Sequence, residues 1–307
     1  MESGIEKSTA WTRLADLKPD QRIAFEALSA RFAPLYRLIR GDGEERYLAD
    51  FYSSAFAQLE PELLPMPSFS FLHSTSISKF IIPSPVKEEA RGYLANLSCG
   101  LSQARFDALI QEDPVGEPPG MILDPLTSHN QVRIMNDLLH FGHAARCEVD
   151  QFDTVVEWGG GYGCLAKLFR RLRAKPATYI IVDFSLMSCV QWLYLATIFG
   201  EGSVHLLTGR DDRIEPGKIN LVPLALIEKL PPLRAELFIS MFALTESSEL
   251  AQRHVVSREW FGAQRLFFSS FARSRRFSCE TVIEGLKASG ARFEKMGGDH
   301  DTFFAFR

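Results

Sequence analysis

Several features that would define a class of protein are missing from this sequence of 307 residues. No run approaches the about 18 uninterrupted apolar residues that a membrane-spanning helix needs, and the first residues lack the apolar core of a signal peptide. The five cysteines are an odd number without a C-x-x-C pair, which argues against a disulfide framework and a zinc site. The net charge of -4 gives no general attraction to nucleic acid or anionic membrane. We therefore expect a soluble, cytoplasmic protein that acts on a small molecule.

What is present is the composition of an ordinary globular protein. With 46% hydrophobic and 23% charged residues, the chain can bury the core of one large α/β domain with an appendage, or of two modest domains. The stretch "DPVGEPPGMILDP", residues 113–125, is dense in proline and glycine and is the best candidate for a linker. We therefore divide the chain into a helical region, residues 1–120, and a cofactor-binding domain, residues 121–307. The first region suits a lid or the contact surface of a homodimer.

The spacing of apolar residues predicts helices first and then alternating strands and helices. In the first third, helices are expected within 19–59, broken near "RGDGEE", and at 87–97 and 102–111. A helix capped by Thr127 then runs to about residue 145. The later strands are expected at 154–157, 179–182, 204–207, 219–222, 237–240 and 266–269, with helices at 165–173, 186–199 and 279–288 and a hairpin at 292–296 and 302–306. Alternation requires crossover connections, so we expect a Rossmann-like, mostly parallel, doubly wound α/β sheet that ends in an antiparallel hairpin.

A glycine-rich turn lies between the first strand of this alternation and the next helix. The run "VVEWGGGYGCLAKLF" places Gly159, Gly161 and Gly163 at G-x-G-x-G spacing, with Cys164 where the dinucleotide fingerprint has its third glycine. Glycine lets the backbone bend and leaves room for a ligand on the main chain. A plain tight connection is the alternative. The cations of the following "KLFRRLRAK" are expected to form a solvent-exposed face.

Two carboxylates favour one kind of ligand for this turn. Glu157 ends the strand before the turn, and Asp183 ends the next strand, "TYIIVDF". Asp183 can accept hydrogen bonds from both hydroxyls of a ribose, although capping of the following helix is an alternative role. A carboxylate at Glu157 is unfavourable beside a pyrophosphate but attracts an amino group and a sulfonium. The pattern therefore indicates S-adenosyl-L-methionine as the cofactor.

At these residues the chain resembles the class I S-adenosylmethionine-dependent methyltransferases. The runs "VVEWGGGYGCLAKLF", "YIIVDFSLMSCVQWLYLATIFG", "LVPLALIEKL" and "AELFISMFALTE" resemble, more narrowly, a bacterial family of sugar O-methyltransferases. The resemblance covers residues 154–246 well, the last strands loosely and the first third weakly. It implies an enzyme that transfers a methyl group to a hydroxyl of a sugar or of a glycosylated small molecule.

The resemblance also implies which residues contact the cofactor. Glu157 and the glycines would hold the methionine part, Asp183 the ribose, and Phe184 the face of the adenine. The loop 223–226 occupies the place where this fold usually meets the adenine ring. The residues assigned to the cofactor are Glu157, Gly159, Gly161, Gly163, Asp183, Phe184, Leu224, Ala225 and Ser240.

Methyl transfer to a hydroxyl needs an aligned acceptor oxygen and is helped by a general base. Glu246, in "MFALTESSE", matches a glutamate that the family places next to the transferable methyl, and helix capping is its alternative role. His300, in the hairpin loop "GGDHD", is the favoured base and His129 the second choice; an exposed turn and a structural helical histidine are the alternatives. Arg273, after the fifth strand, and Arg133 are assigned to the acceptor.

Other functions stay open from the sequence. No metal is expected, because the strand ends "SMFALTE" and "SSFARS" are poor in oxygen ligands, although a metal held by "DHD" stays an alternative. The same cofactor would also serve an amine, a peptide or a polyketide as acceptor. An NAD-dependent oxidoreductase would use the same edge of the sheet, but Cys164 and Glu157 argue against it. A methyltransferase-like module without activity is the last alternative, since no base has a diagnostic spacing.

Overall fold

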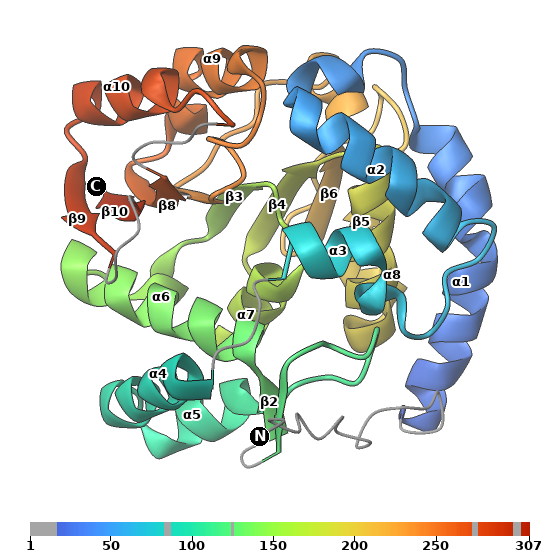
Figure 1. The fold of residues 1–307 in the computed structure, drawn as a ribbon, viewed down its shortest axis with the longest axis horizontal. Helices are drawn as coiled ribbons and strands as arrows, with labels where there is room; N and C mark the ends of the chain where they lie inside the picture. The colour runs from blue at the N-terminus through green and yellow to red at the C-terminus, as the bar shows by residue number, and fades with distance from the viewer. Residues whose placement is uncertain (1–16, 83–86, 124–125, 272–275, 297–301) are drawn as a thin grey trace, which may run out of the picture.

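A computed structural model of the chain describes residues 17–82, 87–123, 126–271, 276–296 and 302–307. Its centre is an eight-stranded sheet with the order β5-β6-β4-β3-β7-β8-β10-β9 (Figure 1). The strands are β3 (Thr154–Trp158), β4 (Thr178–Asp183), β5 (Val204–Leu206), β6 (Ile219–Pro223), β7 (Leu237–Met241), β8 (Arg265–Phe271), β9 (Arg292–Lys295) and β10 (Thr302–Phe306). The strands β3 to β8 pair in parallel, and β10 runs antiparallel between β8 and β9. This confirms the predicted fold architecture, a mostly parallel, doubly wound, Rossmann-like α/β sheet that ends in an antiparallel hairpin.

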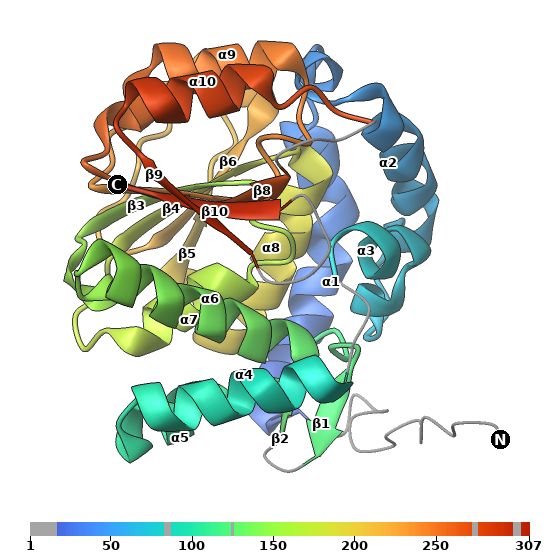
Figure 2. The same ribbon diagram turned by 60° about the vertical axis from the view of Figure 1, so that its left-hand side comes forward.

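Helices cover both faces of the sheet, as crossover connections require (Figure 2). One face packs against α6 (His129–Ala145), α7 (Cys164–Leu172) and α8 (Ser185–Phe199), and the other against α9 (Glu249–Ser257) and α10 (Glu280–Ala288). Neighbouring residues of a strand join opposite cores: Val155 packs with the α6–α8 side and Val156 with the α9–α10 side. This alternation fixes which strand residues point into which layer.

The N-terminal helices wrap the outside of this sheet domain. They are α1 (Pro19–Ile39), α2 (Asp50–Leu63), α3 (Thr75–Phe80), α4 (Lys87–Gly100) and α5 (Gln103–Ile110). The helix α1 lies along α8, and α4 lies against α6 (Figures 1 and 2). Between α1 and α2, Glu44 accepts hydrogen bonds from the backbone N–H and the hydroxyl of Ser185, at 3.1 and 2.6 Å, and so caps the start of α8. Within the described ranges, no helix has both the length and the apolar character needed to cross a bilayer.

The expected linker is not an exposed connection. Most side chains from Glu112 to Pro118 are buried, and the stretch continues into a small antiparallel hairpin, β1 (Met121–Leu123) with β2 (Leu126–Ser128). Ser128, rather than the expected Thr127, caps α6, because its hydroxyl accepts the N–H of Gln131 at 3.2 Å. The helices α3 and α9 were not predicted either.

The cations after the glycine turn are also placed differently from expectation. Lys167, expected on a solvent-exposed face, is fully buried and pairs with Glu112 and, at 3.5 Å, with Asp113. Arg171 contacts both oxygens of Asp113, at 2.9 and 2.8 Å. These ion pairs join α7 to residues 112–113, the start of the buried stretch, because a charge withdrawn from water needs a partner.

Candidate functional site

A cavity of about 520 Å³ opens at the carboxyl ends of β3, β4 and β7, where ligands of such sheets bind. Its size suits one nucleoside-sized ligand with a small neighbour. Three groups of residues line it: the glycine turn with the strand ends, the segment after β7, and the helical region above. Among the lining residues are Tyr52, Phe56, Lys79, Ile81, Glu89, Asn130, Arg133, Glu157, Gly159, Gly160, Gly161, Asp183, Phe184, Leu224, Phe242, Ala243 and Glu246.

The glycine turn needs glycine at two positions that line the cavity. Gly159 and Gly161 have φ values of 76° and 54°, a left-handed conformation that side chains disfavour. A Cβ on Gly159 would lie 2.1 Å from the Cβ of Ala243, and one on Gly161 would lie 2.9 Å from Cγ2 of Ile81. Gly163, also at positive φ, precedes α7 and packs near Leu195 without lining the cavity. Ala243 and Ile81 approach the turn so closely that a side chain at Gly159 or Gly161 would clash with them.

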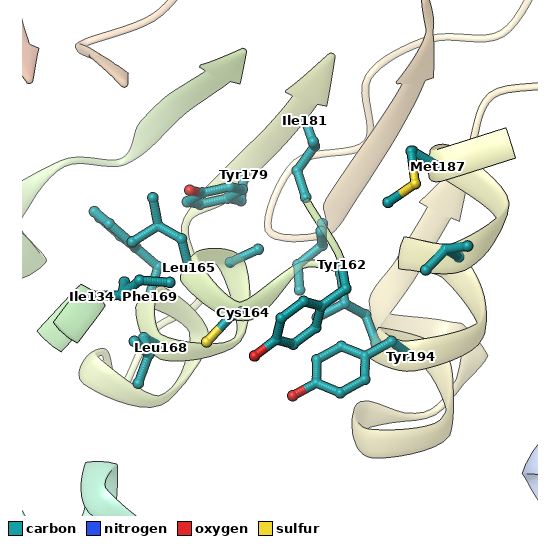
Figure 3. Packing of buried hydrophobic residues seen from close by; sticks show 14 of the residues in the cluster. Ile134, Tyr162, Cys164, Leu165, Leu168, Phe169, Tyr179, Ile181, Met187 and Tyr194 are labelled. Atoms are coloured by element: carbon teal, nitrogen blue, oxygen red, sulfur yellow. The ribbon is translucent and has the colours of Figure 1, made fainter. Parts of the chain in front are cut away.

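Tyr162, inside this turn between Gly161 and Gly163, packs into the core below it. Tyr162 is buried, its ring meets that of Tyr194 edge to face at 5.0 Å, and its hydroxyl accepts a hydrogen bond from Asn130 at 3.0 Å. Figure 3 shows Tyr162 beside Tyr194, with Cys164 and Leu165 at the start of α7 close by. This hydrogen bond joins the glycine turn to the first turn of α6, and so fixes the positions of two walls of the cavity relative to each other.

Asp183 is held at the floor of the cavity. One carboxyl oxygen accepts the N–H of Gly160 at 3.0 Å and the amide of Gln191 at 2.7 Å, and the other accepts the N–H of Phe184 at 2.9 Å. Burial raises the pKa of Asp183 to about 7, although these hydrogen bonds lower it. Asp183 does not cap α8: the helix begins after Phe184 without a side-chain cap of its own.

Glu157 is the second carboxyl group of the floor. It is 3% exposed, lines the cavity, and accepts a hydrogen bond from the hydroxyl of Tyr179 at 2.9 Å. Burial, and to a smaller extent the charge of Asp183, raises the pKa of Glu157 to about 8. Both carboxyl groups are therefore partly protonated near pH 7. They suit a cationic ligand, because a positive charge nearby favours their charged forms.

The other residues assigned to the cofactor divide into two pairs. Phe184 and Leu224, in the short helix η7 (Leu224–Leu226), line the cavity. Ala225 instead faces Gly41, where an added Cβ would lie 2.6 Å from its own. Ser240 is buried outside the lining, donating to the carbonyl of Trp158 at 3.4 Å and accepting from the N–H of Leu244 at 3.0 Å.

On the acceptor side, the structure places Glu246 in the lining, in the segment between β7 and α9. Its carboxyl group accepts a short hydrogen bond from the hydroxyl of Tyr52 in α2. Burial raises the pKa of Glu246, and this hydrogen bond lowers it. Tyr52 and Phe56 were not predicted as site residues, because nothing in the spacing of α2 separates a cavity residue from a core one.

The start of α6 supplies a cation to the same wall. Arg133 lines the cavity, donates to Asn130 at 3.2 Å and pairs with Asp137 at 3.3 Å. His129, one position before Asn130, is buried and outside the lining, with Nε2 at 3.8 Å from a carboxyl oxygen of Glu89. Burial lowers the pKa of His129, so the imidazole is mostly neutral at pH 7.

Two assigned residues, His300 and Arg273, lie outside the described residues. Within the described part of the chain, no three His, Cys, Asp or Glu side chains come together as a metal site would require.

A scan against models of protein families finds no match for this sequence, and a search of the curated proteins finds none either. Among solved structures, magnesium protoporphyrin IX methyltransferase (ChlM) from Synechocystis PCC 6803 with bound SAM aligns over 73% of this chain and 97% of its own, at 12% identity and a TM-score of 0.40. PigF with SAH aligns over 94% and 99%, at 13% identity and a TM-score of 0.39. The pyocyanin biosynthetic protein PhzM aligns over 83% and 70%, at 15% identity and a TM-score of 0.38. Likenesses this distant leave the activity of the chain to be inferred from its own residues.

Proposed function

We propose that this chain is an S-adenosylmethionine-dependent methyltransferase. The observation that carries the proposal is the meeting of Glu157, the glycine turn and Asp183 around one cavity at the carboxyl ends of β3 and β4. The turn lets a ligand lie on the main chain, and Asp183 is placed to accept hydrogen bonds from the two ribose hydroxyls. Glu157 then faces the methionine part, whose amino group and sulfonium are positively charged.

The charges of the lining favour this cofactor over a dinucleotide. The cavity is lined by the carboxyl groups of Glu89, Glu157, Asp183 and Glu246, against the cations Lys79 and Arg133. A cationic ligand stabilises the charged forms of the buried Glu157 and Asp183, whereas a pyrophosphate would favour their protonated forms and gain no attraction from them. The NAD-dependent alternative is therefore disfavoured by electrostatics rather than by the glycine spacing alone.

Phe184 and Leu224 are the residues of the described cavity wall best placed for the adenine. Both line the cavity next to Asp183, at the ends of β4 and β6. An aromatic ring and an aliphatic side chain hold a base through its faces, without hydrogen bonds to its edge. We therefore propose that the adenine lies between these two side chains.

For the acceptor we propose a hydroxyl of a sugar or of a glycosylated small molecule. Beyond Glu157 the cavity combines a partly buried carboxyl group, Glu246, a guanidinium, Arg133, and the aromatic rings of Tyr52 and Phe242. Aromatic faces pack against the C–H groups of a sugar, and a carboxylate of raised pKa is a better proton acceptor for a hydroxyl. His300 stays the alternative to Glu246 as the base, and Arg273 stays a proposed contact of the acceptor.

We also propose that the helical region before residue 121 is the lid over the acceptor. Its contribution to the cavity comes from Leu48, from Tyr52 and Phe56 of α2, from Lys79 of α3 with the following Ile81 and Ile82, and from Glu89 of α4. A wall built by these helices excludes water from the methyl group and shapes the acceptor pocket.

The test of this function is transfer of a labelled methyl group from S-adenosylmethionine by the purified full chain. A panel of monosaccharide glycosides and a matched panel of the corresponding amino sugars are offered as acceptors. We expect transfer to hydroxyl groups of the first panel and none in the absence of acceptor. Transfer only to the amino group of the second panel would contradict a hydroxyl acceptor while leaving the cofactor assignment intact.

A further inference from the structure

A tyrosine of the helical region and a glutamate of the sheet domain meet inside the cavity. Tyr52, in α2, and Glu246, between β7 and α9, are 194 residues apart in the sequence, and both line the cavity. The phenolic hydroxyl donates a short hydrogen bond to Oε2 of the carboxyl group. A carboxylate has two oxygens, so this bond leaves Oε1 as the oxygen that can accept a proton from a bound hydroxyl.

Aromatic packing fixes the position of the Tyr52 ring. The ring stacks on that of Phe277, with a distance of 6.0 Å between the ring centroids and an interplanar angle of 15°. The centroid of the Phe56 ring lies 6.1 Å from that of Tyr52. Phe56 packs in turn on Phe184, at 4.6 Å, and Phe184 follows Asp183 at the end of β4. A row of rings therefore connects the Tyr52–Glu246 pair to the residues proposed to hold the cofactor, so their separation is set by packing rather than by a mobile side chain.

The protonation states of the two residues keep Tyr52 as the hydrogen-bond donor and Glu246 as the acceptor. Burial raises the pKa of Tyr52 far above its ordinary value, with a further rise from the charge of Glu246, so the phenol stays protonated and donates. Among the described residues, Arg276 and Cys279, both between β8 and α10, are the other ionisable groups that interact with the pair: Arg276 lowers the pKa of Tyr52, and Glu246 raises that of Cys279.

We propose that Tyr52 is a positioning residue that holds Glu246 as the acceptor of the substrate's proton during methyl transfer. This rests on the proposed function. The oxygen of the acceptor forms a bond to the methyl carbon, and the bond from that carbon to sulfur breaks, leaving its electron pair on a neutral thioether. The hydroxyl proton passes to Oε1 of Glu246 and from there to solvent. The helical region would then supply part of the catalytic arrangement as well as the lid.

The chain offers a matched control for Tyr52. Tyr47 also donates its hydroxyl to a glutamate of the sheet domain, Glu228, at 2.6 Å, but neither residue lines the cavity. Tyr47→Phe and Tyr52→Phe each remove one tyrosine–glutamate hydrogen bond and keep the ring. The two variants therefore separate loss of a hydrogen bond in general from loss of this one.

The experiment follows the titration of Glu246 by carbon NMR in the full chain labelled with [δ-¹³C]glutamate, with and without S-adenosylhomocysteine; the resonance missing in Glu246→Gln identifies it. We expect Tyr52→Phe to raise the titration midpoint of Glu246 by about one pH unit, because a hydrogen bond to the charged form is lost, and Tyr47→Phe to leave it unchanged. An unchanged midpoint in Tyr52→Phe, or an equal shift in both variants, would overturn the proposal.

Methyl transfer to the glycoside panel gives the second readout. We expect Glu246→Gln to lower the rate at least about 100-fold with S-adenosylhomocysteine affinity nearly unchanged, and the acid limb of the pH profile to move upward in Tyr52→Phe by the same amount as the midpoint. A loss below tenfold in Glu246→Gln would refute proton transfer to this residue. Wild-type protein that binds no S-adenosylhomocysteine would instead refute the proposed function, and the titration would still report on the pair.

Discussion

The two halves of the cavity are built in different ways. The proposed cofactor half consists of Glu157, the glycine turn and Asp183, all within one strand–helix–strand unit from β3 to β4. The acceptor half joins α2, the start of α6 and the segment after β7, which are far apart in the sequence. A site within one local unit can be read from the order of residues, whereas a site assembled by packing depends on every contact that holds its pieces together.

The ion pairs of Lys167 join α7, the helix after the glycine turn, to residues 112–113, and breaking them is expected to have the largest effect. Lys167→Met leaves the buried carboxyl groups of Glu112 and Asp113 without this cation. We expect a loss of about 3–5 kcal/mol in the free energy of unfolding, measured by urea denaturation. Lys175→Met, at an exposed position, serves as the control and should change it by less than about 0.5 kcal/mol.

A double variant tests whether the cost comes from unpaired charge. Replacing both partners in Lys167→Met/Glu112→Gln should recover part of the loss, because the buried carboxylate is no longer left alone. A loss equal to the sum of the two single variants would show that the pair does not couple α7 to residues 112–113.

The next largest effect is expected where the two halves touch directly, at Gly159 and Ala243. Gly159→Ala adds a methyl group that would lie 2.1 Å from the Cβ of Ala243, at a φ of 76°. We expect it to destabilise the fold by about 2–4 kcal/mol, from overpacking and backbone strain together. Gly43→Ala has a similar φ, 86°, in the left-handed region, with only Nε of Arg46 within 4 Å of the added Cβ, at 3.9 Å, and should cost only about 1–2 kcal/mol. Equal losses in the two variants would mean that backbone conformation alone requires glycine in the turn.

A smaller effect is expected on cofactor binding, which should depend on pH through the carboxyl groups of the proposed cofactor half. Glu157 and Asp183 have pKa values raised by burial to about 8 and about 7, so folding favours their protonated forms. The contribution of these groups to folding stability is present at low pH and is lost as the pH rises toward 8. Over the same range the two groups become charged, so their attraction for a cationic ligand increases. We expect S-adenosylmethionine to bind about tenfold more tightly at pH 8.5 than at pH 6.5, by calorimetry.

The matched variant for this pH dependence is Glu157→Gln, which removes the charge and keeps the shape. It should flatten the dependence and weaken binding, because the sulfonium and amino group then face a neutral amide. A dependence that survives in Glu157→Gln would assign it to Asp183 or to the acceptor half.

The cofactor half was largely predictable from the sequence because its signals are local. The strand before the turn, the left-handed glycines and the acid ending the next strand follow from short patterns. Ser240 was assigned at a strand end without regard to alternation: it shares the face of Phe238 and the α9–α10 core, whereas Glu157 shares the face of Val155. Successive side chains of a strand point to opposite faces of the sheet, so only every second residue at a strand end faces the same helix layer.

The acceptor half, and the burial of α7 against residues 112–113, were not predictable in the same way. Tyr52 is a typical helix residue until the fold brings Glu246 to it. Lys167 lies in a run of cations that favours a solvent-exposed face, yet the acids that bury it come from residues 112–113. Such pairings depend on tertiary contacts that helix spacing and composition do not encode.

The central claim, that the floor of this cavity holds S-adenosylmethionine, is tested most directly by calorimetric titration of the full chain with S-adenosylhomocysteine and with NADH. We predict micromolar binding of S-adenosylhomocysteine that Asp183→Ala weakens at least about 100-fold, through the loss of charged hydrogen bonds to the ribose, with Asp107→Ala on α5 as an unaffected control. Tight binding of NADH together with no binding of S-adenosylhomocysteine would contradict it.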